Sequence, residues 1–206
     1  MRAMIRKKGN LFIISAPSGT GKTTLCRQLI DELPGIRHSV SYTTRNPRPG
    51  EVNDRDYTFV DEGEFRKMIE EDEFVEWAKV HGNLYGTSRR RLEEMMGKGL
   101  DVLLDIDTQG ARHLRASREN GVYIFLLPPS LDVLRARLEG RMSDSSENIN
   151  LRMTRAVQEI GEYKNYDYVI VNAVLDQALT ELKAVVIAER VRSKRVNPEW
   201  IRSATV

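Results

Sequence analysis

The fold of this chain follows from one stretch of sequence, Ala16-Pro17-Ser18-Gly19-Thr20-Gly21-Lys22-Thr23-Thr24. An apolar run, Leu11-Phe12-Ile13-Ile14, precedes it, and apolar residues at helical spacing follow it. A strand, a glycine-containing loop and a helix in this order form the context that a phosphate-binding loop requires. We therefore predict that residues 16–24 surround the phosphates of a nucleotide.

The residue types within this loop suit that role. Gly19 and Gly21 let the backbone turn its N–H groups toward a phosphate, and the following helix directs its positive dipole end to the same place. Lys22 can reach the outer phosphates, and the Thr23 hydroxyl can occupy a magnesium position. Ala16 stands where the usual pattern has glycine, which a backbone at negative φ permits. The alternative is a simple turn, but Gly-Lys-Thr after a strand disfavours it.

The composition indicates one domain, or one domain with an inserted lobe. The chain has 206 residues, of which 40% are hydrophobic, so it can bury a full core. Its 32 basic and 30 acidic residues leave a net charge of +2, and nothing global indicates a nucleic-acid or membrane partner. The single cysteine, Cys26, excludes an internal disulfide and fits a reducing compartment, so we expect a cytoplasmic protein with Cys26 in its core.

Apolar runs alternate with helical patterns along most of the chain. We expect core strands at 11–14, 102–107, 123–127 and 168–171, and helices near 25–33, 88–96, 109–118, 130–138, 149–160 and 176–195. Strands that are apolar throughout and separated by helices are typical of a parallel sheet covered on both faces. The expected fold is therefore α/β, a three-layer P-loop fold with a parallel central sheet.

Residues 37–93 interrupt this alternation of apolar strands and helices. Strand-like pieces at 57–60 and 74–77 flank an acidic helix at 61–71, which predicts an inserted lobe with its own small antiparallel sheet. We place the core at about 9–36 and 94–190, and a basic tail at 191–206. A polar segment rich in Ser, Asp and Glu predicts a mobile lid at about 138–155.

Polar residues follow the ends of the expected core strands. Asp105 and Asp107 end one strand, and Asn172 follows another. Because ligands of parallel sheets bind beyond the carboxyl ends of the strands, we expect these residues on the same rim as the phosphate-binding loop. Magnesium would lie near Thr23, and Asp105 is a further candidate that would act through a water.

Arginines form the second signal. Guanidinium groups bind phosphate oxygens in a bidentate way, although a lone arginine is usually a solvated surface residue. Arg141 and Arg152 bracket the expected lid, which favours a role for this pair. The other candidates are Arg45 and Arg48, which flank a turn, and Arg137, one helical turn before Arg141.

Polar side chains of the inserted lobe form the third signal. Each has an ordinary alternative: Glu76 lies between Val75 and Trp77 and could be the outward residue of an alternating strand, and the tyrosines could be core residues. Only the presence of the phosphate-binding loop favours a ligand-binding role for Ser41, Tyr57, Glu76, Tyr85 and Thr87.

These residues give the chain a resemblance to the guanylate kinase family, from Leu11 to about Arg190. The segment 40–51 is the most specific, since other nucleoside monophosphate kinases lack it. The matching motifs are Ser-Ala-Pro-Ser-Gly-Thr-Gly-Lys-Thr (15–23), Val-Ser-Tyr-Thr-Thr-Arg-Asn-Pro-Arg-Pro-Gly-Glu (40–51), Asp-Tyr-Thr-Phe-Val (56–60), Glu-Phe-Val-Glu-Trp-Ala (73–78), Tyr-Gly-Thr (85–87), Leu-Asp-Ile-Asp-Thr-Gln-Gly (104–110) and Arg-Leu-Glu-Gly-Arg (137–141).

The resemblance implies transfer of the γ-phosphoryl group of ATP to GMP, giving ADP and GDP, with Mg²⁺ accompanying ATP. It implies that ATP binds residues 16–24 and Asn172. The residues implied for the GMP phosphate are Ser41, Arg45, Arg48, Tyr57 and Tyr85, and those for the base are Glu76, Thr87 and Asp107. The residues implied for catalysis are Lys22, Arg45, Arg137, Arg141 and Arg152.

The chemistry of guanine agrees with this assignment. Guanine presents N1–H and an N2 amine together, so one carboxylate can accept from both, and Thr87 could donate to O6. No general base is needed, because the attacking GMP phosphate is already an anion, and catalysis reduces to alignment and charge neutralisation.

Three positions depart from the family pattern: Ala16 replaces glycine, Thr87 stands where many members have serine, and Asn172-Ala173-Val174 lacks the usual acidic residues. Two alternatives stay open: a non-catalytic guanylate-kinase-like interaction module, and a kinase for another nucleotide. The presence of Lys22 disfavours the first, and Glu76 with Asp107 disfavours the second. The residues indicate neither a monomer nor a homo-oligomer.

Overall fold

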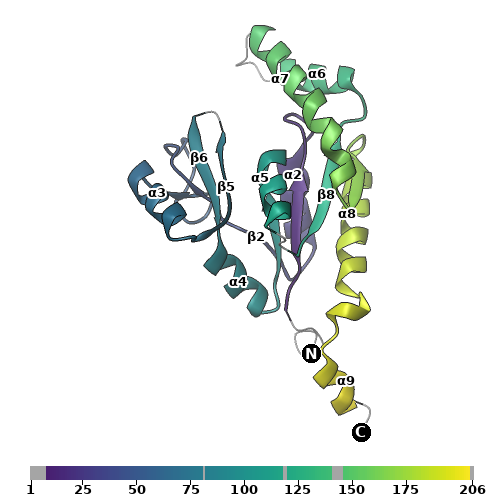
Figure 1. Ribbon diagram of the computed structural model, residues 1–206. Coiled ribbons are helices and arrows are strands. Elements are labelled where there is room, and N and C mark those ends of the chain that lie inside the picture. Colours follow the sequence, from purple (N-terminus) through teal and green to yellow (C-terminus); the bar gives the residue numbers. More distant parts are fainter. Residues whose placement is uncertain (1–7, 81, 118–119, 141–145, 205–206) are drawn as a thin grey trace.

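The computed structural model describes residues 8–80, 82–117, 120–140 and 146–204, and it has the α/β architecture that the sequence predicts. Figure 1 shows the core, with a small lobe on one side and two helices above it. Within the described residues, no helix combines the length and the apolar character needed to cross a membrane.

The core is a five-stranded parallel sheet in the order β2-β7-β1-β8-β9. Its strands are β1 (Leu11–Ser15), β2 (Ile36–His38), β7 (Asp101–Asp105), β8 (Val122–Leu127) and β9 (Tyr168–Val171). β1 lies between β7 and β8. The connection after β1 leads to β2 on one side of it, and the connection after β7 crosses to β8 on the other side, so a crevice opens at the carboxyl end of β1. The short strand β2 belongs to this sheet, although its last two residues fall in the segment that the sequence assigns to the lobe.

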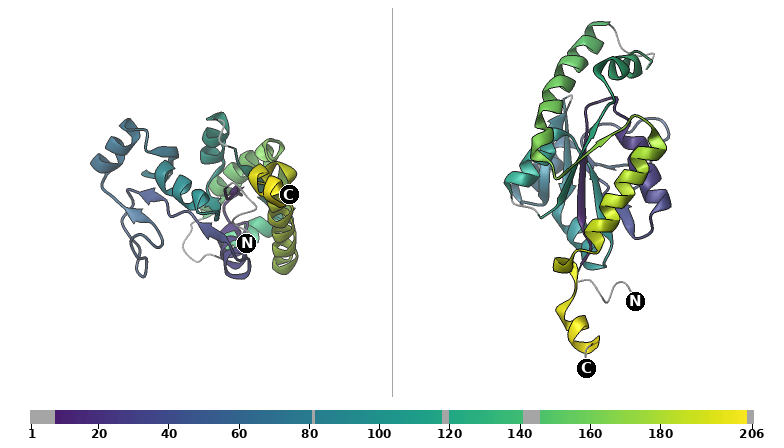
Figure 2. Two further views of the ribbon diagram at one scale, coloured as in Figure 1. Left: turned by 90° about the horizontal axis from the view of Figure 1, so that it is seen from below. Right: turned by 90° about the vertical axis from the view of Figure 1, so that its right-hand side faces the viewer.

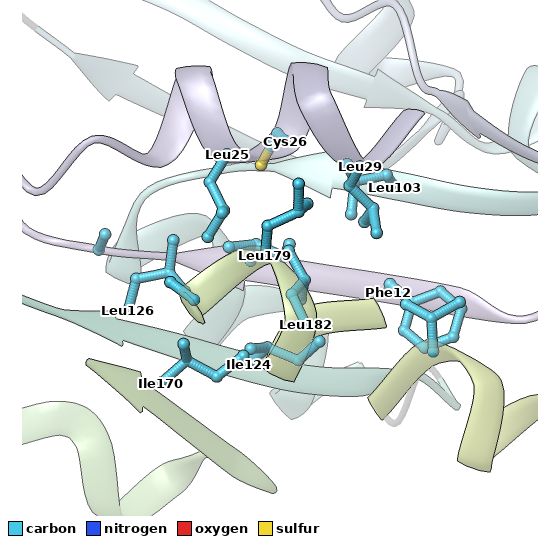
Figure 3. Packing of buried hydrophobic residues seen from close by; sticks show 14 of the residues in the cluster. Phe12, Leu25, Cys26, Leu29, Leu103, Ile124, Leu126, Ile170, Leu179 and Leu182 are labelled. Carbon is cyan, nitrogen blue, oxygen red and sulfur yellow. The ribbon is translucent and has the colours of Figure 1, made fainter. Parts of the chain in front are cut away.

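Alternate residues of β1 point to the two faces of the sheet, and helices cover both. Phe12 and Ile14 pack with α2 (Lys22–Glu32) and α8 (Leu175–Arg190), which lie on the same side in Figure 2. Leu11 and Ile13 pack with α4 (Arg89–Gly97) and α5 (Thr108–Ala116). Cys26 lies in the first of these clusters, as Figure 3 shows, which confirms the expected core position of this cysteine. Burial raises the pKa of its thiol.

The inserted lobe has a four-stranded sheet in the order β4-β3-β6-β5, with the helix α3 (Glu62–Glu70). The strands are β3 (Tyr42–Thr43), β4 (Thr58–Phe59), β5 (Phe74–Val80) and β6 (Asn83–Ser88). The expectation of a purely antiparallel sheet is wrong, because β3 and β4 pair in parallel. The 14 residues between them include a turn-rich segment, 46–56, which carries the chain back to start β4 in the same direction as β3.

The segment expected to be a lid, 138–155, covers the end of α6 (Leu131–Glu139) and most of α7 (Ser146–Ile160). These two helices pack together and lie above the sheet in Figure 1. The Ser130 hydroxyl accepts a hydrogen bond from the Val133 amide and caps α6, as the sequence predicts. A 3₁₀ helix, Gly161–Asn165, follows α7 and leads into β9.

The carboxyl-terminal tail differs from the expectation of one helix running to about residue 195. α8 ends at Arg190, a 3₁₀ turn covers Ser193–Arg195, and a separate helix, α9 (Pro198–Ala204), follows. Pro198 stands at the first position of α9, where its missing N–H costs no hydrogen bond.

A buried ion pair joins the end of α8 to the sheet. Arg190 Nε donates to Asp101 Oδ2 at 2.6 Å, and the two side chains are 7% and 1% exposed. Asp101 Oδ1 accepts from the backbone N–H of Asn10, and an Arg190 nitrogen donates to the carbonyl of Pro34. One pair of side chains thus fixes the starts of β1 and β7, the end of α2 and the end of α8.

We expect Arg190→Met to lower the free energy of unfolding by about 3 kcal/mol, because it leaves the Asp101 carboxylate buried without its cation. Urea denaturation followed by circular dichroism at pH 7 measures this change. The control is Lys183→Met, which breaks the more exposed pair with Glu32 and should cost less than about 1 kcal/mol. Equal losses in the two variants would contradict the structural role assigned to the buried pair.

Candidate active site

A cleft of about 760 Å³ opens at the carboxyl rim of the five-stranded sheet. This volume is typical of sites for small molecules, which occupy roughly 300–1,000 Å³. Four parts of the chain supply its walls: the loop after β1, the end of β5, the first half of α5, and one face of α7 with the turn that follows. The loop residues that line it are Ala16, Pro17, Ser18, Gly19, Gly21, Lys22, Thr23 and Thr24.

The loop has the backbone geometry that the sequence predicts. Gly19 and Gly21 have φ angles of +92° and +96°, which disfavour any residue with a side chain. Ala16 is not among the described residues with positive φ, so its methyl group is tolerated as expected. Asn172, at the end of β9, donates from Nδ2 to the buried Thr20 carbonyl at 2.8 Å and supports the loop.

Lys22 joins the loop to the neighbouring strand. Its Nζ lies 2.6 Å from Asp105 Oδ1 and 2.8 Å from the carbonyl oxygen of Ile106. Burial acts to lower the pKa of Lys22, but the Asp105 carboxylate outweighs burial and the net shift is upward. Lys22 is therefore a firmly charged ammonium group at the carboxyl ends of β1 and β7.

Arginine and tyrosine side chains gather in the lobe. One Arg45 guanidinium nitrogen donates to both oxygens of Glu51, at 2.8 and 2.9 Å, and its central carbon lies 5.4 Å from the centre of the Tyr57 ring. The rings of Tyr57 and Tyr85 are 6.0 Å apart. The Arg48 amide donates to Glu51 as well. The side-chain hydrogen bond between Arg45 and Glu51 is the main cause of two shifts: it raises the pKa of Arg45 and lowers the pKa of Glu51.

Glu76 is buried, with only 7% of its surface exposed, while the next residue, Trp77, is exposed. The strand pairing shifts between Phe74 and Glu76, which marks a β-bulge. A bulge rotates the side chains that follow it, so Glu76 faces inward. The alternative that Glu76 is the outward residue of a regular strand is wrong.

The Glu76 carboxylate has a specific environment. The Thr87 hydroxyl donates to its Oε1 at 2.5 Å from the adjacent strand β6. Burial raises the pKa of Glu76 to about 7, the Thr87 hydrogen bond opposes this shift, and the charge of Asp107 adds to it. Asp107 caps α5 by accepting the Gly110 amide at Oδ1, at 2.8 Å. Two carboxylates therefore meet where the lobe contacts the core.

The other expected residues lie in different surroundings. Arg137 donates to the carbonyl oxygens of Thr20 and Asn172, both at 3.2 Å, and Arg152 donates to the Ser18 hydroxyl at 2.5 Å. Ser41 is half-buried just before β3. Arg141 lies outside the described residues. The structure thus brings together three groups: the loop with Lys22, Arg137 and Arg152; the lobe cluster around Arg45; and Glu76 with Thr87 and Asp107.

The sequence did not single out two features of the site. Glu51 closes the 40–51 motif, and its position three residues after Arg48 was the signal that could have revealed it. Glu159 lines the cleft from α7, two helical turns after Arg152. Burial raises the pKa of Glu159, and the charge of Asp107 adds to the shift.

Residues 8–189 match the model of the guanylate kinase family. The chain belongs to this family. It is 58% identical over 192 residues to the guanylate kinase of Geobacter sulfurreducens, across 93% of this chain and 95% of the relative. It is 48% identical over 195 residues to that of Syntrophotalea carbinolica, across 95% and 93%. The crystal structure of guanylate kinase from Anaplasma phagocytophilum is similar, with a TM-score of 0.76 and 35% identity across 95% of this chain and 93% of that one.

Family membership identifies the chain as an enzyme, an ATP-dependent kinase of GMP. The expected resemblance, fold and reaction class are confirmed. A non-catalytic interaction module is not favoured, because the relatives named above are guanylate kinases that match nearly the whole chain.

We expect Glu76→Gln to stabilise the folded chain at pH 8. The pKa of Glu76 is raised from 4.5 to about 7, so the folded state binds this proton more tightly than the unfolded state. The contribution of Glu76 to wild-type stability therefore falls as pH rises from about 4.5 to 7, and the uncharged amide avoids this loss. The gain should be absent near pH 4 and reach about 3 kcal/mol above pH 7, from the size of the shift.

Urea denaturation of both proteins between pH 5 and 8 measures this difference. The control is Glu93→Gln, which changes an exposed carboxylate on α4 and should leave the pH profile as it is. A Glu76→Gln chain that is less stable than wild type across the whole range would contradict the assigned cost of the buried charge.

Proposed function

We propose that GMP binds in the lobe with its guanine at Glu76, Thr87 and Asp107, and that ATP binds on the loop 16–24. One observation carries the proposal: a buried carboxylate, Glu76, has a side-chain donor, Thr87, on one oxygen and lies beside Asp107 at the junction of lobe and core. A buried acid without a cation is costly to a folded protein, and such costs are typical of functional sites.

Guanine would relieve this cost. Its N1–H and N2 amine are donors on one edge, and Glu76 could accept from both, with Asp107 as a further acceptor for the amine. Adenine presents an unsubstituted N1, so its lone pair would face the carboxylate. A buried acceptor left without a donor costs several kcal/mol, which is enough for discrimination of about a thousandfold or more.

The GMP phosphate would lie among Arg45, Arg48, Tyr57, Tyr85 and Ser41. Glu51 supports this proposal, because it already orients Arg45 by accepting from its guanidinium group. A phosphate is a natural further ligand for such a group, since bidentate binding of oxyanions is the usual chemistry of arginine.

Phosphoryl transfer would then depend on alignment and charge. Lys22, Arg137 and Arg152 lie on or contact the loop, and Lys22 would turn from Asp105 toward the ATP phosphates. Arg45 and Arg141 complete the set of proposed catalytic arginines. No side chain needs to remove a proton, because the attacking group is an anionic phosphate oxygen.

Magnesium would reach this site together with ATP. Within the described ranges, no group of three His, Cys, Asp or Glu residues could hold a metal ion by itself. The Thr23 hydroxyl lines the cleft and could supply one ligand, and Asp105 could act through a water, so ATP oxygens would have to supply much of the coordination. When bound, Mg²⁺ neutralises charge that develops on the phosphates.

We also propose the division of the chain that the sequence indicates: a core at about 9–36 and 94–190, a GMP-binding lobe at 37–93, a lid at 138–155 and a basic tail at 191–206. Residues 37 and 38 are the exception, because they belong to β2 of the core sheet. The contact of α5 with β5 and the position of α7 over the loop support a role for lobe and lid closure. The reducing compartment that suits a lone buried Cys26 supports a cytoplasmic location.

A coupled ADP-release assay with GMP, AMP, CMP and UMP in parallel tests the base assignment in wild type and Glu76→Gln. The amide keeps one acceptor oxygen, but its NH₂ group opposes the donors of guanine, so kcat/KM for GMP should fall about a hundredfold or more. The ratio of kcat/KM for GMP to kcat/KM for AMP should fall, while the KM for ATP stays unchanged. Glu93→Gln serves again as the control. A variant that keeps the wild-type GMP preference would refute the role of Glu76.

Lys22→Ala should reduce kcat by orders of magnitude, because charge stabilisation on the phosphates is the core of the mechanism. GMP affinity, measured by calorimetry, should change little, since the proposed GMP site lies in the lobe. Circular dichroism checks the fold, and Lys67→Ala on the exposed side of α3 is the control. Near-normal turnover of the Lys22→Ala chain would be incompatible with the proposed mechanism.

A further inference from the structure

Gly110 is a buried glycine that contacts both carboxylates of the proposed base site. It is the third residue of α5, and its amide donates to Asp107 Oδ1 at 2.8 Å. Its backbone does not require glycine, because the described glycines with positive φ are residues 19, 21, 35, 50, 82 and 99. Inside a helix, glycine is less favourable than alanine by about 1 kcal/mol. The reason for glycine here is therefore space.

The space that a side chain would need is occupied by Glu76. A Cβ atom at residue 110 would lie 2.8 Å from Glu76 Oε2, 3.4 Å from Ile106 Cδ1 and 3.5 Å from Asp107 Oδ1. A separation of 2.8 Å is shorter than any ordinary contact of a Cβ atom, so the carboxylate would have to move. Even the smallest side chain at this position is incompatible with the observed place of the Glu76 carboxylate.

The surroundings of Glu76 leave little freedom for such a movement. Thr87 donates to Oε1, the other carboxylate oxygen, at 2.5 Å, and Glu76 is buried. The elements that carry the two residues also contact each other, since the Nδ1 atom of His113 on α5 lies 3.2 Å from the Trp77 carbonyl oxygen on β5. The carboxylate is thus confined between a hydroxyl on β6 and the bare backbone of α5.

We propose that Gly110 is a positioning residue for base recognition: its missing side chain lets the Glu76 carboxylate approach the start of α5, beside Asp107. This inference rests on the proposed role of Glu76 and Asp107 in reading guanine. Because the Gly110 amide also holds Asp107, one residue sets the places of both acceptors relative to each other. The carboxylates of Glu76 and Asp107 can then accept hydrogen bonds from N1–H and the N2 amine of a single base, whereas a displaced Glu76 carboxylate would be poorly placed for both.

Gly110→Ala tests the proposal directly. The variant adds one methyl group and touches no part of the phosphate-binding loop. We expect kcat/KM for GMP to fall between about tenfold and a hundredfold, in line with the cost of a misplacement of about 1 Å in a site. The ratios of kcat/KM for GMP over IMP and for GMP over AMP should both fall, since IMP lacks the N2 amine and adenine lacks N1–H. The KM for ATP should stay within about twofold of wild type.

Two further glycines provide matched controls. Gly97→Ala, at the end of α4, adds a methyl group with no atom within 4 Å and should change nothing. Gly121→Ala crowds the Ile13 side chain, at 2.2 Å from Cδ1. Gly121 directly precedes β8, at the amino ends of the core strands and away from the carboxyl rim that holds the cleft. The substitution could lower stability, but it should leave the nucleotide ratios unchanged. The ratios do not depend on the folded fraction, so they remain informative if Gly110→Ala is less stable.

A double-mutant cycle with Glu76→Asp separates positioning from a general disturbance. Aspartate is shorter by one methylene group, so its carboxylate should not reach the new methyl group. Gly110→Ala should therefore cost less than about threefold in kcat/KM for GMP in the Glu76→Asp background, although it costs tenfold or more in wild type. Equal costs in both backgrounds, or equal losses for GMP and ATP, would overturn the proposal.

The same assays distinguish the proposal from the base assignment beneath it. If Glu76→Gln narrows the GMP/AMP preference while Gly110→Ala leaves it unchanged, the role of Glu76 stands and the role of Gly110 is refuted. If Glu76→Gln itself leaves the GMP/AMP preference unchanged, the role of Glu76 in base recognition is refuted, and the proposal for Gly110 loses its basis. Narrowed ratios in both single variants, with a smaller effect of Gly110→Ala in the Glu76→Asp background, would support both.

Discussion

The parallel pairing of β1 with β7 is the constraint on which the rest of the site depends. It brings the loop after β1 and the carboxylates after β7 to one rim, and the ion pair of Lys22 with Asp105 closes the junction at 2.6 Å. The Lys22 ammonium also donates to the Ile106 carbonyl. Both strands are buried, so the hydrophobic effect holds them in the core, and the Asp101 carboxylate, which accepts from the Asn10 backbone N–H, fixes their starts relative to each other.

The lobe differs from the core because it buries an ionisable group, the Glu76 carboxylate. Glu76 is held inside by a bulge, with a hydroxyl on one side and the backbone of α5 on the other. This arrangement costs the folded chain stability above pH 7, and under the proposed function it places a buried carboxylate where a base with two donors would bind. If Glu76 reads the base as proposed, stability and specificity are opposed at this residue, which is a common property of functional sites.

Most of the fold could be predicted from the sequence because it depends on local patterns. The loop after β1, the buried strands and the Ser130 cap follow from glycine positions, apolar runs and capping chemistry. The parallel pair of β3 and β4, the place of β2 in the core sheet and the separate helix α9 could not, because very short strands and a terminal helix carry little periodicity. Their positions depend on pairing with segments distant in the chain.

The sequence by itself determined the phosphate-binding loop, the alternation of strands and helices, and the residue types at the site, because these are encoded in neighbouring residues. Only the tertiary structure decided which of them face one another. Nothing local distinguishes an inward Glu76 from an outward one, since a single bulge reverses its direction. Nor does the sequence show that Gly110 is glycine for the sake of a carboxylate 34 residues earlier in the chain, because that contact exists only where α5 packs on β5.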